Sequence, residues 1–145
     1  MRLSGAVEQA CCIIILLVQP ARRAPVTNNS LAKRMGVSPT YITKVTRKLV
    51  RAGLITSARG AGGGFRLARA YDTITLRDIT EAIEGAGTFV KYQGVAERMF
   101  AHQPKSKLLR GANIILRTFD EAQERWLRAL QSVTIQDVVK EVAHD

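Results

Sequence analysis

The sequence predicts a mainly α-helical fold that contains one small β-hairpin, and three observations favour this fold. Two short helical segments joined by a turn occupy residues 27–53, a glycine-rich stretch separates two strand-like segments in residues 54–69, and a long helical periodicity follows Pro104. The chain has 145 residues, of which 46% are hydrophobic, so it is long enough to bury an ordinary core. This composition excludes a disordered chain.

The first predicted helix contains the apolar run ACCIIILLV, which begins at Ala10. The run is too short to span a membrane. Arg2 is the single basic residue before it, whereas a secretory signal carries several positive charges before its apolar core. We therefore expect a buried first helix in a cytoplasmic protein that has no membrane partner. Cys11 and Cys12 are neighbours in that helix and cannot pair with each other without strain, so we expect both to be inert core residues.

Capping residues delimit two helices between Thr27 and Gly53. Thr27 is an N-cap residue for the first helix, which Gly36 can end by adopting the left-handed conformation. Ser38 caps the second helix, and Pro39 stands at its first position, where the missing N–H is not needed. The two helices and the turn between them form a helix-turn-helix.

The second of these helices has one apolar side and one side rich in basic and hydroxyl groups. At about 100° per residue, Ile42, Val45 and Leu49 share the apolar side, which we expect to be buried. No acidic residue occurs in residues 37–69, and this composition suits a surface that contacts phosphates. The opposite side of the helix carries Thr40, Lys44, Arg47 and Arg51.

The stretch RGAGGGFRLAR, residues 59–69, predicts the tip of a β-hairpin. Strand-like segments flank the glycines at residues 54–55 and 65–67, and glycine adopts a positive φ at little cost. Such a tip presents Arg59 and Arg66. A nucleotide-binding loop is excluded, because no Lys-Ser or Lys-Thr pair follows the glycines. A helix-turn-helix followed by a hairpin is a winged-helix arrangement.

The excess positive charge lies in the first half of the chain. The formal net charge is +10, and residues 1–77 contain 13 lysines and arginines against two acids, while residues 78–145 contain nine against ten. A basic half joined to a neutral half indicates a polyanion-binding module attached to a region with another task. Charge alone leaves a merely solvated basic face as the alternative.

Two stretches of sequence resemble one known family. The stretch AGLITSARGAGGGFRLAR, followed by ITLRDITEAIEG, is similar to the Rrf2 family of bacterial winged-helix transcription regulators, and the resemblance covers residues 1–85. It implies a homodimer that inserts a recognition helix into the major groove of DNA and a wing into the minor groove. It also implies that Ser38, Tyr41, Lys44 and Arg47 lie on the recognition helix, Arg59 on the wing, and Gly62, Gly63 and Gly64 at the wing tip.

The exposed side of the helix and the resemblance together give one set of predicted DNA-binding residues. The set is Ser38, Thr40, Tyr41, Thr43, Lys44, Arg47, Lys48, Arg51, Arg59, Gly62, Gly63, Gly64 and Arg66.

Residues 86–103 depart from the cluster-binding members of that family. Those members carry three cysteines in this segment, whereas this chain has none. Thiolates hold iron–sulfur clusters, so we expect no cluster and no other cofactor. His102 is alone in the segment, and we expect no metal site there. The signal would then be an unknown small molecule or a protein effector that acts on this segment and the long helix, or there would be no effector.

A long helix is predicted after Pro104, because apolar residues recur at alternating spacings of four and three up to Val133. Such a helix needs an apolar partner, and we expect a second copy of the chain. Packing within one subunit and a ligand pocket lined by Phe119 and Trp126 are the alternatives. The predicted dimerisation residues are Leu108, Ala112, Ile115, Phe119, Ala122, Trp126 and Leu130.

The chain is therefore expected to contain a winged-helix DNA-binding domain at residues 1–85, a connecting segment at 86–103 and a helical dimerisation region at 104–145. The last region would close with a short helix over residues 135–142, capped by Thr134. We expect a sequence-specific regulator of the nucleoid, a homodimeric repressor on an imperfect palindromic operator in double-stranded DNA. A winged helix that binds RNA or docks a protein is the alternative. No clustered carboxylates, nucleophile–base pair or metal-ligand spacing indicates an enzyme.

Overall fold

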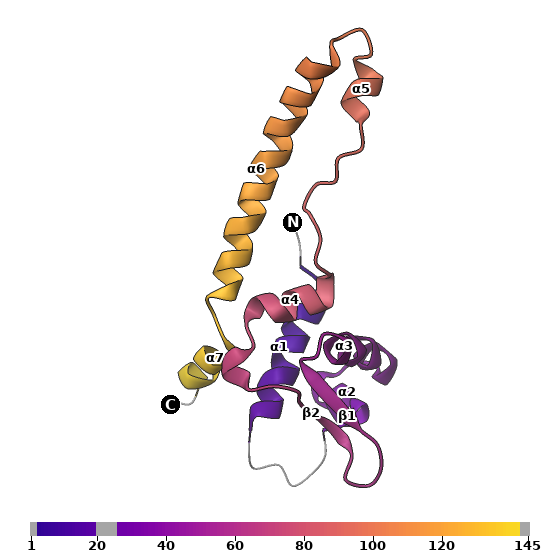
Figure 1. Cartoon of the computed structure of the whole chain (residues 1–145). Helices are drawn as coiled ribbons and strands as arrows, with labels where there is room; N and C mark the ends of the chain where they lie inside the picture. Colours follow the sequence, from indigo (N-terminus) through magenta and orange to yellow (C-terminus); the bar gives the residue numbers. More distant parts are fainter. Residues whose placement is uncertain (1–2, 20–25, 143–145) are drawn as a thin grey trace. The chain divides into compact units, whose positions relative to one another are not determined.

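The computed structural model describes residues 3–19 and 26–142. The chain forms two compact units (Figure 1). The first unit comprises the chain up to Ala86 together with the chain from Leu130 onward, and the second comprises Gly87–Ala129. The described residues are mainly helical and contain one two-stranded antiparallel hairpin, which confirms the predicted fold class.

The predicted elements occur in the predicted order, and the structure adds α4 and two short elements, η1 and α5, that have too few residues to show a periodicity. No helix in the described part of the chain is long and apolar enough to cross a membrane. The first unit contains α1 Gly5–Val18, α2 Asn28–Met35, α3 Pro39–Arg51, β1 Ile55–Ala58, β2 Gly64–Leu67, the 3-10 helix η1 Tyr71–Thr73, α4 Leu76–Glu84 and α7 Ile135–Val142. The second contains α5 Val95–Met99 and most of α6 Lys105–Gln131.

Capping residues set the bounds of α2 and α3, as predicted. The backbone N–H of Ser30 donates to Thr27 Oγ1 at 3.2 Å, and the N–H of Thr27 donates to Ser30 Oγ at 2.9 Å. Gly36 ends α2 with φ 65°, and Ser38 Oγ accepts from the N–H of Tyr41 at 3.2 Å. These bonds satisfy N–H groups that the start of a helix leaves unpaired.

The core of the first unit is built from the apolar sides of its helices. Ile42, Val45 and Leu49 of α3 are at most 3% exposed, so the predicted apolar side of that helix is buried. They belong to one cluster with Ile13 of α1 and Leu31 of α2. Full burial of such a side chain is worth roughly 1.5–3 kcal/mol. The opposite side of α3 is thereby turned to solvent.

The β1–β2 hairpin forms the predicted wing, and its geometry requires three of its glycines. The antiparallel register ends with Ala58 opposite Gly64. Gly60 has φ 97° and Gly64 has φ 121°, a region that residues with side chains disfavour. A Cβ on Gly63 would lie 2.4 Å from the carbonyl oxygen of Ala58. The glycine-rich composition therefore reflects both the turn conformation and close backbone packing.

The C-terminal helix α7 packs with the first unit. Thr134 caps it as predicted, because its Oγ1 accepts from the backbone N–H of Asp137 at 3.2 Å, and its own N–H donates to Asp137 Oδ2 at 2.8 Å. An antiparallel bridge joins Thr134 to Thr75, and Ile135 is fully buried. The sequence-based division placed all of residues 104–145 in one region, because a bridge between segments far apart in the chain leaves no local signal.

In the second unit, the segment before α5 packs against α6. The ring centroids of Phe89 and Trp126 are 5.5 Å apart, and the N–H of Phe89 donates to Gln123 Oε1 at 2.7 Å. The prediction that the helical stripe reaches Val133 was wrong, since α6 ends at Gln131. The carbonyl oxygen of Val133 instead accepts from the first N–H of α4.

The two cysteines lie on different sides of α1. Cys11 is half-buried, and this burial raises the pKa of its thiol. Cys12 is exposed, so the expectation of two core cysteines is wrong for Cys12. Adjacent helical residues point about 100° apart, and Ile13 and Ile14 occupy the buried side of the helix.

Replacing Ile135 with alanine should destabilise the first unit by about 2–5 kcal/mol, because the lost methylene groups leave a cavity. Val142→Ala in the same helix should change stability by less than about 0.5 kcal/mol, since Val142 is 71% exposed. Urea unfolding followed by circular dichroism measures both changes. Equal stabilities of Ile135→Ala and the wild type would show that α7 does not stabilise this unit.

Candidate nucleic-acid interface

The solvent-facing side of α3 carries most of the predicted recognition side chains. Thr40, Lys44, Arg47 and Arg51 are exposed, and Tyr41 is 37% exposed despite its size. Because core packing fixes the rotation of α3 about its axis, these side chains share one surface.

Two hydroxyl groups predicted to bind DNA already make bonds within α3. Ser38 Oγ accepts the N–H of Tyr41, and Thr43 Oγ1 donates to the carbonyl oxygen of Pro39 at 2.9 Å. A hydroxyl that acts as an acceptor keeps its own hydrogen for donation. Ser38 can therefore still donate to an anion at the start of α3, where the helix dipole also favours negative charge, whereas the Thr43 hydrogen is engaged.

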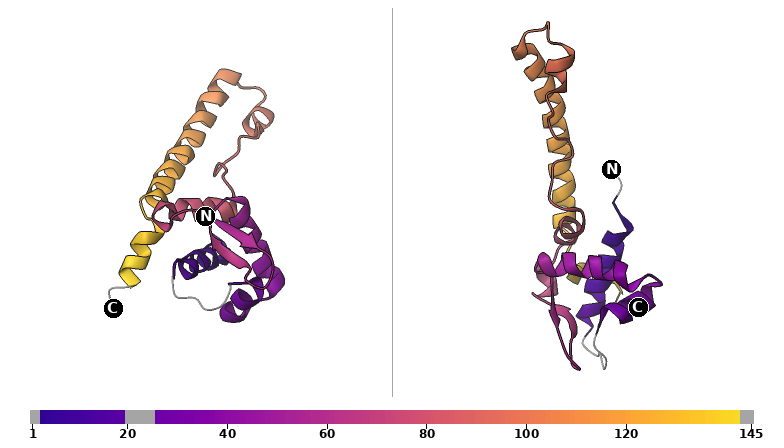
Figure 2. Two further views of the ribbon diagram at one scale, coloured as in Figure 1. Left: turned by 60° about the horizontal axis from the view of Figure 1, so that its bottom comes forward. Right: turned by 90° about the vertical axis from the view of Figure 1, so that its right-hand side faces the viewer.

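The wing presents two arginines beside α3. Arg59 and Arg66 are exposed. Nothing lies within 4 Å of a Cβ placed on Gly62, so this glycine leaves open space at the tip. The N–H of Phe65 donates to the carbonyl oxygen of Val26 at 2.8 Å, which ties β2 to the segment before α2. The contact between α3 and β1 holds the wing next to the recognition helix (Figure 2).

Lys48 and Arg69 are engaged inside the unit. Lys48 Nζ donates to the carbonyl oxygen of Ile83 at the end of α4. Arg69, at the base of the wing, forms an ion pair of 2.7 Å with Asp78. Sequence reasoning grouped Lys48 with the DNA-binding residues because it is a basic residue of α3, and a partner on another helix leaves no signal in the local pattern. The structure directs its ammonium group to the end of α4, where Arg51 lines the same hollow.

Positive charge is least neutralised along the middle of α3 and at the wing. Residues 37–69 contain no acid. At the far end of α3, Lys48 and Arg51 share an open hollow with Glu81 and Glu84 of α4. A surface dominated by one sign of charge attracts a polyanion and raises its rate of association.

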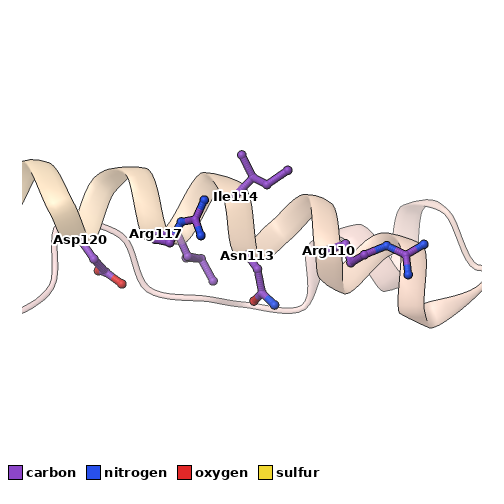
Figure 3. Close-up of a pocket in the computed structure, with 6 residues that line it drawn as sticks. Arg110, Asn113, Ile114, Arg117 and Asp120 are labelled. Carbon is purple, nitrogen blue, oxygen red and sulfur yellow. The ribbon is translucent and has the colours of Figure 1, made fainter.

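Helix α6 presents apolar side chains to solvent. Ile115 and Phe119, both in the predicted stripe, are 58% and 45% exposed. Ile114, which the prediction did not include, is 63% exposed and projects from a different side of α6 than Asn113 and Asp120 (Figure 3). Its place next to Ile115 widens the apolar surface. Of the other predicted dimerisation residues, Leu108, Ala112, Trp126 and Leu130 are half-buried and Ala122 is exposed.

A helix-turn-helix with a basic outward face, followed by an arginine-bearing wing, defines a DNA-binding protein of the winged-helix class. The chain belongs to the Rrf2 family, described as iron-dependent transcriptional regulators, which it matches over residues 3–141. It is therefore a DNA-binding transcription regulator and not an enzyme.

One relative and two solved structures match almost the whole chain. The HTH-type transcriptional regulator YwgB of Bacillus subtilis is 30% identical over 143 residues, which are 98% of this chain and 86% of the relative. The structure of CymR, the global cysteine regulator of B. subtilis, is 26% identical, covers 97% of this chain and 98% of its own, and has a TM-score of 0.64. IscR of T. potens is 25% identical, with coverages of 98% and 88% and a TM-score of 0.63. These likenesses confirm the predicted family and fold.

The family description names iron, but the donor residues of this chain do not fit an iron–sulfur site. Thiolates are the usual ligands of such clusters. The two cysteines, Cys11 and Cys12, are adjacent in α1, and residues 86–103 contain none. Within residues 3–19 and 26–142, no three His, Cys, Asp or Glu side chains are grouped so that they could hold a metal ion.

Anaerobic reconstitution with ferrous iron and sulfide should leave the purified protein without the visible absorption of a cluster, because the chain offers no set of thiolate ligands. Absorbance spectra and iron analysis before and after desalting measure this. A brown chromophore with stoichiometric iron and sulfide would contradict the expectation.

Proposed function

We propose that this regulator binds an imperfect palindromic operator as a homodimer, with α3 in the major groove and the wing in the minor groove, and represses transcription by occupying that site. The observation that carries the proposal is the exposed basic side of α3, in a stretch of residues 37–69 without an acid. An α-helix fits the major groove of B-form DNA, whereas the deep, narrow major groove of A-form RNA excludes side chains. This favours duplex DNA over the RNA alternative.

Two kinds of contact are proposed for α3. Arg47 and Lys44 lie at the centre of the exposed side, where long basic side chains can reach the O6 and N7 acceptors of guanine. Polar groups at the start of the helix and basic groups along its flank would bind phosphates and set the register of the protein on DNA. These phosphate-binding residues are Ser38, Thr40, Tyr41 and Arg51.

The wing is proposed to follow the minor groove. Arg59 stands at the start of the tip, and a guanidinium group is weakly hydrated, so it enters a narrow A·T-rich groove more readily than an ammonium group. Arg66 on β2 would bind a phosphate. The small volume of Gly62, Gly63 and Gly64 would let the backbone of the tip approach the groove wall.

Arg47→Ala should weaken binding to the cognate site by roughly 1–3 kcal/mol and weaken binding to random duplexes much less, because loss of a base contact removes discrimination. Fluorescence anisotropy with both duplexes at one salt concentration measures the two losses. Arg125→Ala, on α6, provides a control with the same change of charge. Equal losses of Arg47→Ala on both duplexes would mean that Arg47 binds a phosphate and reads no base.

The dimer is proposed to form through α6. Ile114, Ile115 and Phe119 expose apolar surface on a single helix, and such a surface on a water-soluble unit usually marks an interaction site. A second copy of the chain would cover it and would supply the second recognition helix. Two-fold symmetry then requires two inverted half-sites spaced by about one helical turn of DNA, or by a multiple of it.

Ile115→Glu should convert the dimer into a monomer, because it would bury a charged carboxylate in an apolar interface. Glu124→Lys changes a charge on the opposite side of α6, at about 100° per residue, and should leave the dimer intact. Sedimentation velocity at micromolar concentration measures both. A wild-type protein that sediments as a monomer would refute the dimer.

An effector, either a small molecule or a protein, is proposed to act on residues 86–103 and α6. An open pocket of about 230 Å³ lies between residues 90–96 and α6, with Ala112, Ile115 and Leu116 on its helical side. Because this pocket lies in the second unit, an effector bound there would act on the proposed dimerisation region.

A further inference from the structure

The last turn of α4 has no basic residue of its own. A helix leaves its final carbonyl groups unpaired, and the partial negative charge at that end favours a cation. α4 instead carries Glu81 and Glu84 near this end. Arg77 offsets Glu81 through an ion pair of 3.1 Å, but the final carbonyl groups still need a donor from elsewhere.

Lys48 of the recognition helix provides that donor. Its Nζ donates to the carbonyl oxygen of Ile83, and its ammonium group places a positive charge at the negative end of the α4 dipole. The positive charge of Lys48 also acts on the neighbouring carboxylate of Glu84. Its pKa is lowered, first by hydrogen bonds from Ser4 and further by the positive charge of Lys48.

The same end of α4 is also tied to the start of α1. Glu84 Oε1 accepts from the backbone N–H of Ser4 at 2.8 Å and from Ser4 Oγ at 2.6 Å. Three helices of the DNA-binding unit therefore meet where α4 ends. Gly85 follows with φ 89°, and the first of the two segments that make up this unit ends at the next residue, Ala86.

We propose that Lys48 is a positioning residue that fixes the end of α4 to the recognition helix. It thereby fixes, relative to α3, the point and direction at which the chain leaves the DNA-binding unit for the dimerisation region. The inference rests on the proposed homodimer: in a dimer, the spacing of half-sites that the protein accepts depends on where each chain leaves its DNA-binding unit.

The geometry favours this role over a phosphate contact. A phosphate that drew the Lys48 ammonium away from Ile83 would leave a carbonyl group unpaired and weaken the effect of the positive charge on Glu84. Lys44, one helical turn earlier on α3, is exposed like Lys48, but no bond from its ammonium group to another helix is present in the described residues. Lys44 is therefore a matched control for Lys48 on the same helix.

The first test uses the full-length protein without DNA. Lys48→Met keeps the length of the side chain and removes the donor. The backbone N–H of Gly85 donates to the carbonyl oxygen of Glu81 at 2.9 Å in the last turn of α4. Hydrogen exchange of this amide should become about tenfold faster in Lys48→Met. Lys44→Met should leave that exchange unchanged, and Lys48→Arg should restore most of the protection. Unchanged exchange of Gly85 in Lys48→Met would overturn the tie between the two helices.

The second test measures DNA binding, with a duplex selected by the wild-type protein from a random-sequence pool as the probe. Arg51→Met should reduce the slope of log affinity against log salt by about one, as expected for the phosphate contact proposed for Arg51, and Lys48→Met should leave the slope unchanged. Inserting one base pair between the half-sites should weaken wild-type binding, and this penalty should shrink a few-fold in Lys48→Met.

A salt slope reduced by about one in Lys48→Met, with the spacing penalty unchanged, would show that Lys48 binds a phosphate and would overturn the inference. A wild-type protein that prefers no duplex over random DNA would refute the proposed function, and the role in spacing with it. The exchange experiment would still decide whether Lys48 holds α4, so the two failures are distinguishable.

Discussion

The burial of Ile42, Val45 and Leu49 is the constraint on which the recognition surface depends. These side chains fix the rotation of α3, and a rotation by one residue, about 100°, in one direction would carry Lys44 and Lys48 toward the core. Burying a lysine or arginine without a partner costs far more than the burial of one aliphatic side chain contributes. The packing that buries the apolar side of α3 is therefore also what keeps Lys44 and Arg47 exposed to solvent.

The wing depends on the same core. Leu54 and Ile55, at the start of β1, are 1% exposed, so the hairpin leaves the core in a fixed direction. The bond from Phe65 to Val26 fixes the returning strand. The tip can then close tightly because Gly63 has no Cβ to meet Ala58. A glycine stretch that resembles a nucleotide-binding loop thus serves a turn that holds arginines at the edge of the recognition helix.

Sequence reasoning succeeded where the determining interactions are local. Thr27, Ser38 and Thr134 bond to residues three positions away, so their helix starts could be identified from neighbouring residues alone. The alternation of buried and exposed positions along α3 is equally local, and so is the glycine-rich stretch between two strand-like segments that predicted the hairpin. The likenesses to CymR and IscR confirm the predicted family and fold.

Sequence reasoning failed where a partner is remote in the chain. The bridge between Thr75 and Thr134, which brings α7 to the DNA-binding unit, has no periodic signal. The same holds for Lys48, whose charge and helix position match those of Lys44 and whose acceptor, Ile83, lies on another helix. The exposure of Cys12 followed from which side of an almost wholly apolar α1 is buried, and composition could not decide that.

The central claim is that a two-fold dimer reads two copies of one half-site through α3. Selection of duplexes from a random-sequence pool by the full-length protein, followed by sequencing of the bound DNA, tests it most directly. The account predicts enrichment of an inverted repeat whose half-site centres are about one helical turn apart, or a multiple of it. Enrichment of a single unrepeated site, or of no sequence at all, would contradict it.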